Sequence, residues 1–257
     1  SSRVETVTID HLAVAIHGQS FGTQHVDKNL AAGFGAAEKE CFNIGLLHTS
    51  LDGREGHAVY APCALDDLRS KGYQYWALGH VHKQEIVSED PWVVFSGCIQ
   101  GRHIRETGPK GCVLVRADGN SVIGVGQVVL DVLRWVHCRV DLTDVTDLQE
   151  LLERTREAVV EARAAADGRP VAMRIRFEGA TELFRKLAAY PERFEQQIRA
   201  LVAEISGDEI WVERIENRAA GKLDLHSALT SDSALGMLLT EIMSTTEHPG
   251  EEAKIKA

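Results

Sequence analysis

Two histidines, His80 and His82, follow an apolar run in the stretch "ALGHVHK" (77–83). If residues 79–82 are extended, side chains two positions apart lie on the same side of the strand, so both imidazoles face one space. Imidazole nitrogens bind zinc, manganese, iron and related ions. Open α/β sheets place their ligands at the carboxyl ends of the strands. The pair therefore predicts two metal ligands at a strand end, with hydrogen-bonded structural histidines as the alternative.

A third histidine, His48, closes another apolar run, "NIGLLHTS" (43–50), and one short helix is expected between the two runs. A single intervening helix favours parallel, neighbouring strands. His48, His80 and His82 would then meet at one sheet edge as a transition-metal site. Three unrelated strand-end histidines remain the alternative at this point.

Basic side chains gather in the segment "GRHIRETGPKG", which contains Arg102, His103, Arg105 and Lys110. The net charge of the whole chain, −10, argues against a protein that coats nucleic acid by bulk charge. Residues 96–140 nevertheless carry six Lys and Arg against three Asp and Glu. Because guanidinium groups pair with phosphate oxygens in fork geometry, this segment is predicted to contact DNA phosphates. Surface arginines without a specific partner are the alternative.

The elements that position these residues change in character along the chain. Strands are expected at 6–17, 43–50 and 92–97, with a short helix at 62–72 that has a proline start and a glycine stop. Mostly β-rich sequence follows at 111–140. This order is typical of an α/β layer with a buried sheet.

A compact α+β module is expected after this layer. Apolar residues at helical spacing predict a helix at 147–166, and a second helical stretch is interrupted at Pro191. Alternating residues predict strands at 171–177 and 207–215. A last amphipathic helix is expected at Leu235–Met243.

The composition narrows the class of protein. With 257 residues and 44% hydrophobic content, the chain can bury a real core. It has no apolar run of 18 residues and no secretory signal, so we expect a cytoplasmic protein without a membrane partner. The five cysteines are odd in number and form no CxxC pair, which favours reduced thiols without assigned chemistry.

The segments "NIGLLHTS", "YWALGHVH" and "GRHIRETGPKG" together resemble the calcineurin-like metallophosphoesterases, over most of residues 10–145. The extended form "FSGCIQGRHIRETGPKG" is similar to the DNA-repair exonuclease branch that includes SbcD-like nuclease subunits. The resemblance implies an α/β fold, namely the C-terminal portion of a metallophosphoesterase β-sandwich flanked by helices, followed by a small α+β capping domain. The implied boundaries are 1–135 for the nuclease portion, 136–216 for the capping domain and 217–257 for a C-terminal helix and tail.

The resemblance also implies two divalent metal ions, usually manganese. His48 and His80 resemble ligands of one ion, and His82 resembles a ligand of the other. The family takes its carboxylate ligands from an Asp-x-His motif, a Gly-Asp motif and an Asn-His pair, and we recognise none of them at the matching place in this sequence. We therefore expect an N-terminally truncated chain with an incomplete metal site, no catalytic residue of its own and no activity alone.

The implied function is that of a metal-dependent DNA exonuclease in DNA repair. DNA, an SbcC-like ATPase and a second copy of the chain are the expected partners. Two alternatives remain open. One is a metallophosphoesterase that acts on a small phosphodiester or a phosphoprotein, and the other is a non-catalytic DNA-binding or scaffold subunit.

Overall fold

The protein was analysed as a computed structural model, which describes residues 3–23, 25–52, 59–222, 237–238 and 241. The chain forms two compact units. The first unit comprises Ser1–Cys138, Val160–Arg174 and Ser206–Arg214, and the second comprises Arg139–Val159, Ile175–Ile205 and Ile215–Ala257.

A six-stranded sheet forms the centre of the first unit. Its strands are β1 (Glu5–Ile9), β2 (Val14–Gly18), β3 (Phe42–His48), β4 (Tyr75–Gly79), β5 (Glu85–Glu89) and β6 (Trp92–Phe95). Their order across the sheet is β1-β2-β3-β4-β6-β5. The four central strands are parallel to their neighbours, whereas β1 and β5 pair antiparallel at the edges. The expected α/β layer is therefore confirmed at this level.

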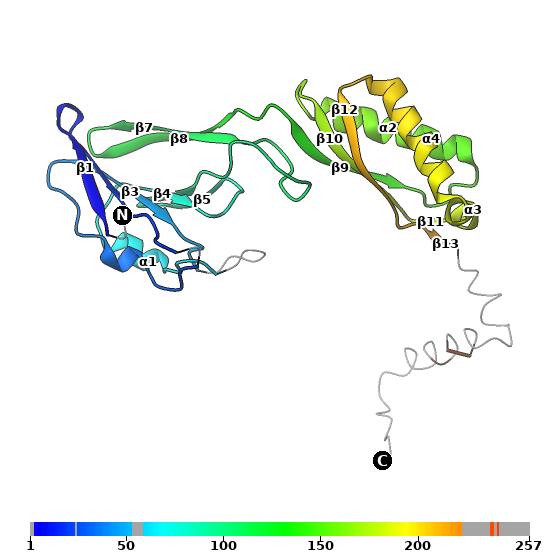
Figure 1. Cartoon of the computed structure of the whole chain (residues 1–257). Coiled ribbons are helices and arrows are strands. Elements are labelled where there is room, and N and C mark those ends of the chain that lie inside the picture. Colours follow the sequence, from blue (N-terminus) through cyan, green and yellow to red (C-terminus); the bar gives the residue numbers. More distant parts are fainter. Residues whose placement is uncertain (1–2, 24, 53–58, 223–236, 239–240, 242–257) are drawn as a thin grey trace, which may run out of the picture. The chain divides into compact units, whose positions relative to one another are not determined.

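Both faces of this sheet are covered. On one face, helix α1 (Leu65–Arg69) contributes to a core that contains the fully buried Trp76. On the other face, the hairpin of β7 (Gly111–Asp118) and β8 (Ser121–Val129) packs valines against a cluster that includes Tyr75 (Figure 1). Strands buried on two sides need apolar side chains at successive positions, which explains the unbroken run "YWAL" of β4.

Short 3-10 turns connect some of these strands. One turn, Asp10–Leu12, joins β1 to β2, and a second, Ala31–Gly33, lies between β2 and β3.

The second half of the chain builds a three-stranded sheet of order β12-β10-β9 with helices. Its strands are β9 (Arg134–Asp141), β10 (Val171–Glu178) and β12 (Ile210–Asn217), and its helices are α2 (Leu148–Ala164), α3 (Phe184–Ala189) and α4 (Pro191–Ser206). A small parallel pair, β11 (Ala180–Thr181) and β13 (Ala220–Gly221), completes the described elements. The predicted strand and helix order of this module is confirmed.

The core of the second unit follows the amphipathic pattern of α4. Phe177 of β10 meets Phe194 of α4 edge to face, with ring centroids 4.9 Å apart, and Ile198 is fully buried one turn later. The predicted interruption at Pro191 is confirmed, because α3 ends at Ala189 and α4 begins at Pro191. Proline is favoured at a first helical position, where its missing N–H costs no hydrogen bond.

The helix expected at Leu235–Met243 lies largely outside the described residues, so it stays a prediction. Among the helices that the structure describes, none is long and apolar enough to cross a membrane.

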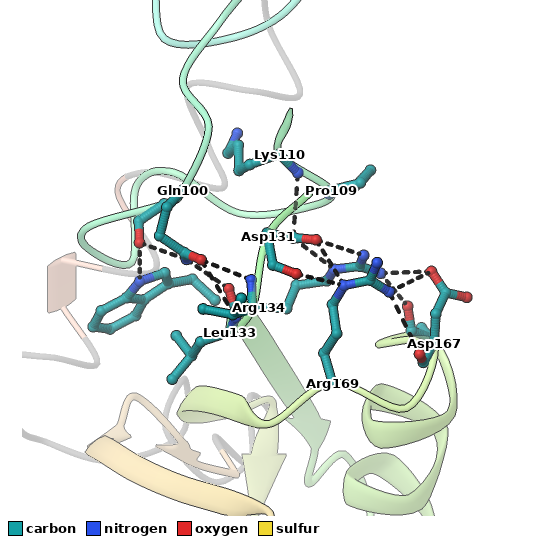
Figure 2. Close-up of polar contacts among 12 residues, drawn as sticks. Gln100, Pro109, Lys110, Asp131, Leu133, Arg134, Asp167 and Arg169 are labelled. Carbon is teal, nitrogen blue, oxygen red and sulfur yellow. Dashed lines mark hydrogen bonds and ion pairs between the residues drawn. The ribbon is translucent and has the colours of Figure 1, made fainter. Parts of the chain in front are cut away.

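A buried polar network joins distant segments of the first unit (Figure 2). The wholly buried Asp131 carboxylate accepts hydrogen bonds from the Arg134 guanidinium at 3.2 and 3.3 Å and from the Lys110 backbone N–H at 3.2 Å. The guanidinium of Arg169 lies 2.8 Å from the same carboxylate. Arg134 also donates to Asp167 at 2.9 Å. Buried charges are tolerated when they are paired in this way, and the network fixes the connection between β8 and β9.

Candidate functional site

The carboxyl ends of β3 and β4 bring two histidines together. The two strands are parallel neighbours, and His48 lies opposite Gly79, directly before His80. His80 Nδ1 lies 3.3 Å from His48 Nε2, and the two rings are nearly perpendicular at 82°. The predicted parallel arrangement of these strands is therefore confirmed, and it places both imidazoles at one sheet edge.

The separation of these two nitrogens fits either a hydrogen bond between the two rings or a shared cation. Two nitrogens bound to one ion at about 2.0–2.1 Å and at a tetrahedral angle lie roughly 3.3 Å apart. His48 also has a lowered pKa, because burial disfavours its charged form and the nearby His80 and His82 add repulsion. Since a metal binds the neutral imidazole, a lowered pKa keeps His48 in its ligand form at neutral pH.

The expectation that residues 79–82 are extended is wrong. Strand β4 ends at Gly79, and His80 has a φ of 100°, so the chain bends there. A β-carbon on Gly79 would lie 2.9 Å from His48 Nδ1, closer than a side chain tolerates. The close approach of the two strands thus requires a glycine, and the bend, rather than strand alternation, directs His80 and His82.

His82 faces a buried carboxylate that the sequence analysis missed. His82 Nδ1 lies 2.6 Å from Glu106 Oε1, and Glu106 Oε2 accepts a hydrogen bond from the Arg102 backbone N–H at 2.8 Å. Burial alone would raise the pKa of Glu106. The hydrogen bonds from Arg102 and His82 and the charge of His103 outweigh burial, so its pKa is lowered and the carboxylate is held ionised.

One signal in the sequence could have identified Glu106: it is the single acidic residue among residues 91–117. Cys98, to which we assigned no chemistry, lies close to His82 and Glu106. Its sulfur, a nitrogen of His82 and a carboxylate oxygen of Glu106 all lie within 4.8 Å of one another, a spacing that could hold a metal ion. All five thiols are free, as expected from the cysteine spacing.

Aromatic rings enclose the pair of histidines at the sheet edge. Tyr60 stacks on His80 with centroids 5.5 Å apart and meets His48 edge-on at 5.1 Å, while Phe21 contacts both His48 and Tyr60. Burial raises the pKa of the Tyr60 phenol. Within the described part of the chain the Tyr60 hydroxyl is buried without a hydrogen-bond partner.

A cavity of about 550 Å³ opens beside His82. Its lining is predominantly basic: His82, Lys83, His103, Arg105, Glu106, Thr107 and Lys110.

The structure thus brings three of the four predicted DNA-contacting residues to one cavity. Arg102 is the fourth, and its exposed guanidinium lies 3.5 Å from His82 Nδ1 and 3.8 Å from Glu106 Oε1. Lys110 is buried and its backbone takes part in the Asp131 network. The cavity can therefore present positive charge to an anion next to a candidate metal ligand.

Comparisons with known proteins agree with this chemistry. Residues 135–220 match the family described as "Metallophosphoesterase YhaO, middle domain". The chain is also 32% identical over 214 residues to the "Uncharacterized metallophosphoesterase YhaO" of Bacillus subtilis (strain 168). The aligned residues make up 82% of this chain and 52% of the relative. The chain thus spans about half the length of the curated relative that it matches. The narrower SbcD-like branch stays a prediction, and the comparisons support the metallophosphoesterase family for this chain.

Proposed function

We propose that the protein is a manganese-dependent DNA exonuclease of the SbcD-like type, which hydrolyses phosphodiester bonds during DNA repair in the cytoplasm. His48 and His80 would hold one divalent cation and His82 would hold a second. The proposal includes the expectation that three imidazoles form only part of the donor set, so that the 257-residue chain alone is inactive. Divalent cations in such a site polarise phosphoryl oxygens and activate water near neutral pH.

The observation that carries this proposal is the placement of the histidines. The 3.3 Å separation between His48 and His80 fits one shared ion, and His82 stands beside a basic cavity. An ion at this edge would lie next to side chains that attract phosphate.

The basic side chains have a role of their own in the proposal. Arg105 offers a planar guanidinium, which suits two phosphate oxygens, and Lys83 and Lys110 supply point charges. His103 lies 3.4 Å from Glu106, which orients it toward the same cavity lining. We propose that these residues and Arg102 hold the DNA backbone while the histidines hold the metals.

The test is nuclease activity of the natural full-length protein with Mn²⁺ and labelled duplex DNA. We expect cleavage that is lost by at least about tenfold in His80→Ala, because removal of a metal ligand is costly. His11→Ala is the matched control. His11 is exposed in the β1–β2 turn, at the opposite end of the strands from His48, and its loss should leave activity unchanged. Absence of cleavage in the wild-type protein would refute the exonuclease proposal.

The same assay separates the two alternatives. A phosphoesterase for small substrates would hydrolyse a model phosphodiester such as bis(p-nitrophenyl) phosphate and leave DNA intact. A scaffold subunit would bind DNA without hydrolysing either substrate. The basic cavity favours a polyanion over a small substrate, because it brings several cations to one surface.

We also propose two protein partners. An SbcC-like ATPase would bind through the segment at Leu235–Met243, which lies largely outside the described residues. Self-association of the chain is the second proposal, and light scattering coupled to size exclusion would test it. A monomer at high protein concentration would contradict it.

A further inference from the structure

Glu106 is a buried carboxylate with both oxygens engaged. It retains 7% of its surface exposed. Oε1 lies 2.6 Å from His82 Nδ1 and 3.4 Å from His103 Nε2, and Oε2 accepts the Arg102 backbone N–H at 2.8 Å. The backbone N–H of Glu106 donates to the His103 carbonyl at 2.8 Å. A carboxylate anchored at both ends has a fixed orientation relative to the His82 ring.

Backbone contacts hold the turn that carries His82 against the turn at 97–101. The Cys98 N–H donates to the His82 carbonyl at 3.2 Å. A β-carbon on Gly97, whose φ is 76°, would lie 2.9 Å from Gln84 N and 3.0 Å from His82 O, so this approach needs a glycine. The glycine-containing turn at 97–101 and the turn that carries His82 are therefore packed backbone to backbone, and the segment that carries Glu106 follows directly.

This geometry selects one tautomer of His82. An ionised carboxylate can only accept hydrogen bonds, so the short contact to Nδ1 requires a proton on that nitrogen. In a neutral imidazole the other nitrogen, Nε2, then carries the lone pair. Metal-binding histidines commonly donate their second N–H to a carboxylate, which fixes the ring and strengthens the ligand.

We propose that Glu106 is a positioning residue, which holds His82 as the Nδ1–H tautomer and leaves Nε2 free to bind a divalent cation. This inference rests on the proposed function, in which His82 is a metal ligand. Glu106 itself does not bind the metal in this arrangement. The competing arrangement is a mononuclear site in which His82, Glu106 and Cys98 bind one soft cation directly, since their ligand atoms lie within 4.8 Å.

Glu106→Gln is a sharp test because the Arg102 backbone N–H dictates how the amide must lie. The amide oxygen has to occupy the position of Oε2, since that site faces a donor. The NH₂ group then faces His82 Nδ1 and requires it to be unprotonated. The variant, which keeps the shape of the side chain, should therefore switch His82 to the Nε2–H tautomer.

The first measurement is long-range ¹H–¹⁵N NMR of the metal-free, ¹⁵N-histidine-labelled 257-residue chain at about pH 8, where an unperturbed imidazole is neutral. The His82 signals are assigned by their loss in His82→Ala. We expect a protonated Nδ1 in the wild-type chain and a protonated Nε2 in Glu106→Gln. A wild-type Nε2–H tautomer, a doubly protonated ring, or an unchanged tautomer in the variant would each overturn the inference. The wild-type measurement stands even if the variant does not fold.

The second measurement is the affinity for Co²⁺ by calorimetry and visible absorption. We expect Glu106→Gln to weaken binding by about 10- to 100-fold, as other losses of a carboxylate partner to a ligating histidine do. Cys98→Ala separates the two arrangements, because Cys98 Sγ donates to the His82 carbonyl and would bind the cation only in the mononuclear site. An equal loss in Cys98→Ala, or a cobalt–thiolate absorption band, would overturn the inference in favour of the mononuclear site. The tautomer is measured without metal or DNA. Its result is therefore independent of the nuclease assay, and failure of one proposal can be told apart from failure of the other.

Discussion

At the scale of single residues, Gly79 shows how the sheet edge constrains the candidate site. A β-carbon there would lie 2.9 Å from His48 Nδ1. We expect Gly79→Ala to displace the His48 ring and to lower the free energy of unfolding by about 1–3 kcal/mol, the usual cost of overpacking. Urea denaturation followed by circular dichroism measures the stability, and Co²⁺ titration measures the loss of metal affinity.

Gly126→Ala is the control for this prediction. Gly126 lies in β8, and a β-carbon at this position would have no heavy atom within 4 Å. Its substitution should change stability little. Equal stability and equal Co²⁺ affinity of the two alanine variants would show that the close approach at Gly79 does not constrain His48.

At the scale of elements, Arg174 of β10 and Glu213 of β12 form a two-pronged ion pair. Nε and an Nη of the guanidinium lie 2.8 Å from the two carboxylate oxygens, and both side chains are less than one-fifth exposed. The hydrogen bond from Arg174 lowers the pKa of Glu213 below its ordinary value of 4.5. The pair therefore stabilises the fold above about pH 4.5, and this stabilisation is lost as the pH falls through the lowered folded-state pKa.

We expect Glu213→Gln to cost about 1.5 kcal/mol at neutral pH, since hydrogen bonds to charged groups are worth about that much. The difference from wild type should shrink as the pH falls below 4.5 and through the lowered pKa of the folded Glu213, where the carboxylate becomes protonated. Urea denaturation at several pH values checks this. Glu195→Gln is the control. It removes the partner of Arg199 within α4, which is more exposed than Glu213, and should cost less than about 0.5 kcal/mol. If the difference between Glu213→Gln and wild type did not change with pH, the ionised Glu213 carboxylate would not be the source of the stabilisation.

The elements themselves could largely be predicted from the sequence, whereas the local geometry of the site could not. Apolar runs predicted strands β3 and β4, and alternating residues predicted β10, because burial on one or two faces of a strand imposes a pattern on its side chains. Helical spacing and Pro191 predicted the interrupted helical stretch. The bend at His80 has no such period, since its positive φ depends on packing against another strand. Glu106 was missed for a related reason: its partner His82 lies 24 residues away in the sequence.

At the scale of the whole molecule, the Asp131 network tests whether buried charge holds together segments that are distant in sequence. Asp131 is wholly buried, and the Arg134 side chain is 4% exposed. Removal of one partner of a buried pair leaves an uncompensated charge, which costs about 3–5 kcal/mol. We therefore expect Asp131→Asn to lower the free energy of unfolding by about this amount.

Asp167→Asn is the matched control for the Asp131 prediction, because Asp167 pairs with the same Arg134 but its side chain is 71% exposed. An exposed ion pair contributes little to stability, so the control should be mild. The double variant Asp131→Leu/Arg134→Met should be less destabilised than Asp131→Asn, because it removes the buried Arg134 charge together with its partner, and the Arg169 side chain that also loses Asp131 is partly exposed. Urea denaturation of the wild type, Asp131→Leu, Arg134→Met and the double variant gives the coupling energy between Asp131 and Arg134. If Asp131→Asn were as mild as Asp167→Asn, water would be reaching the network and the buried charges would not govern the stability of this unit.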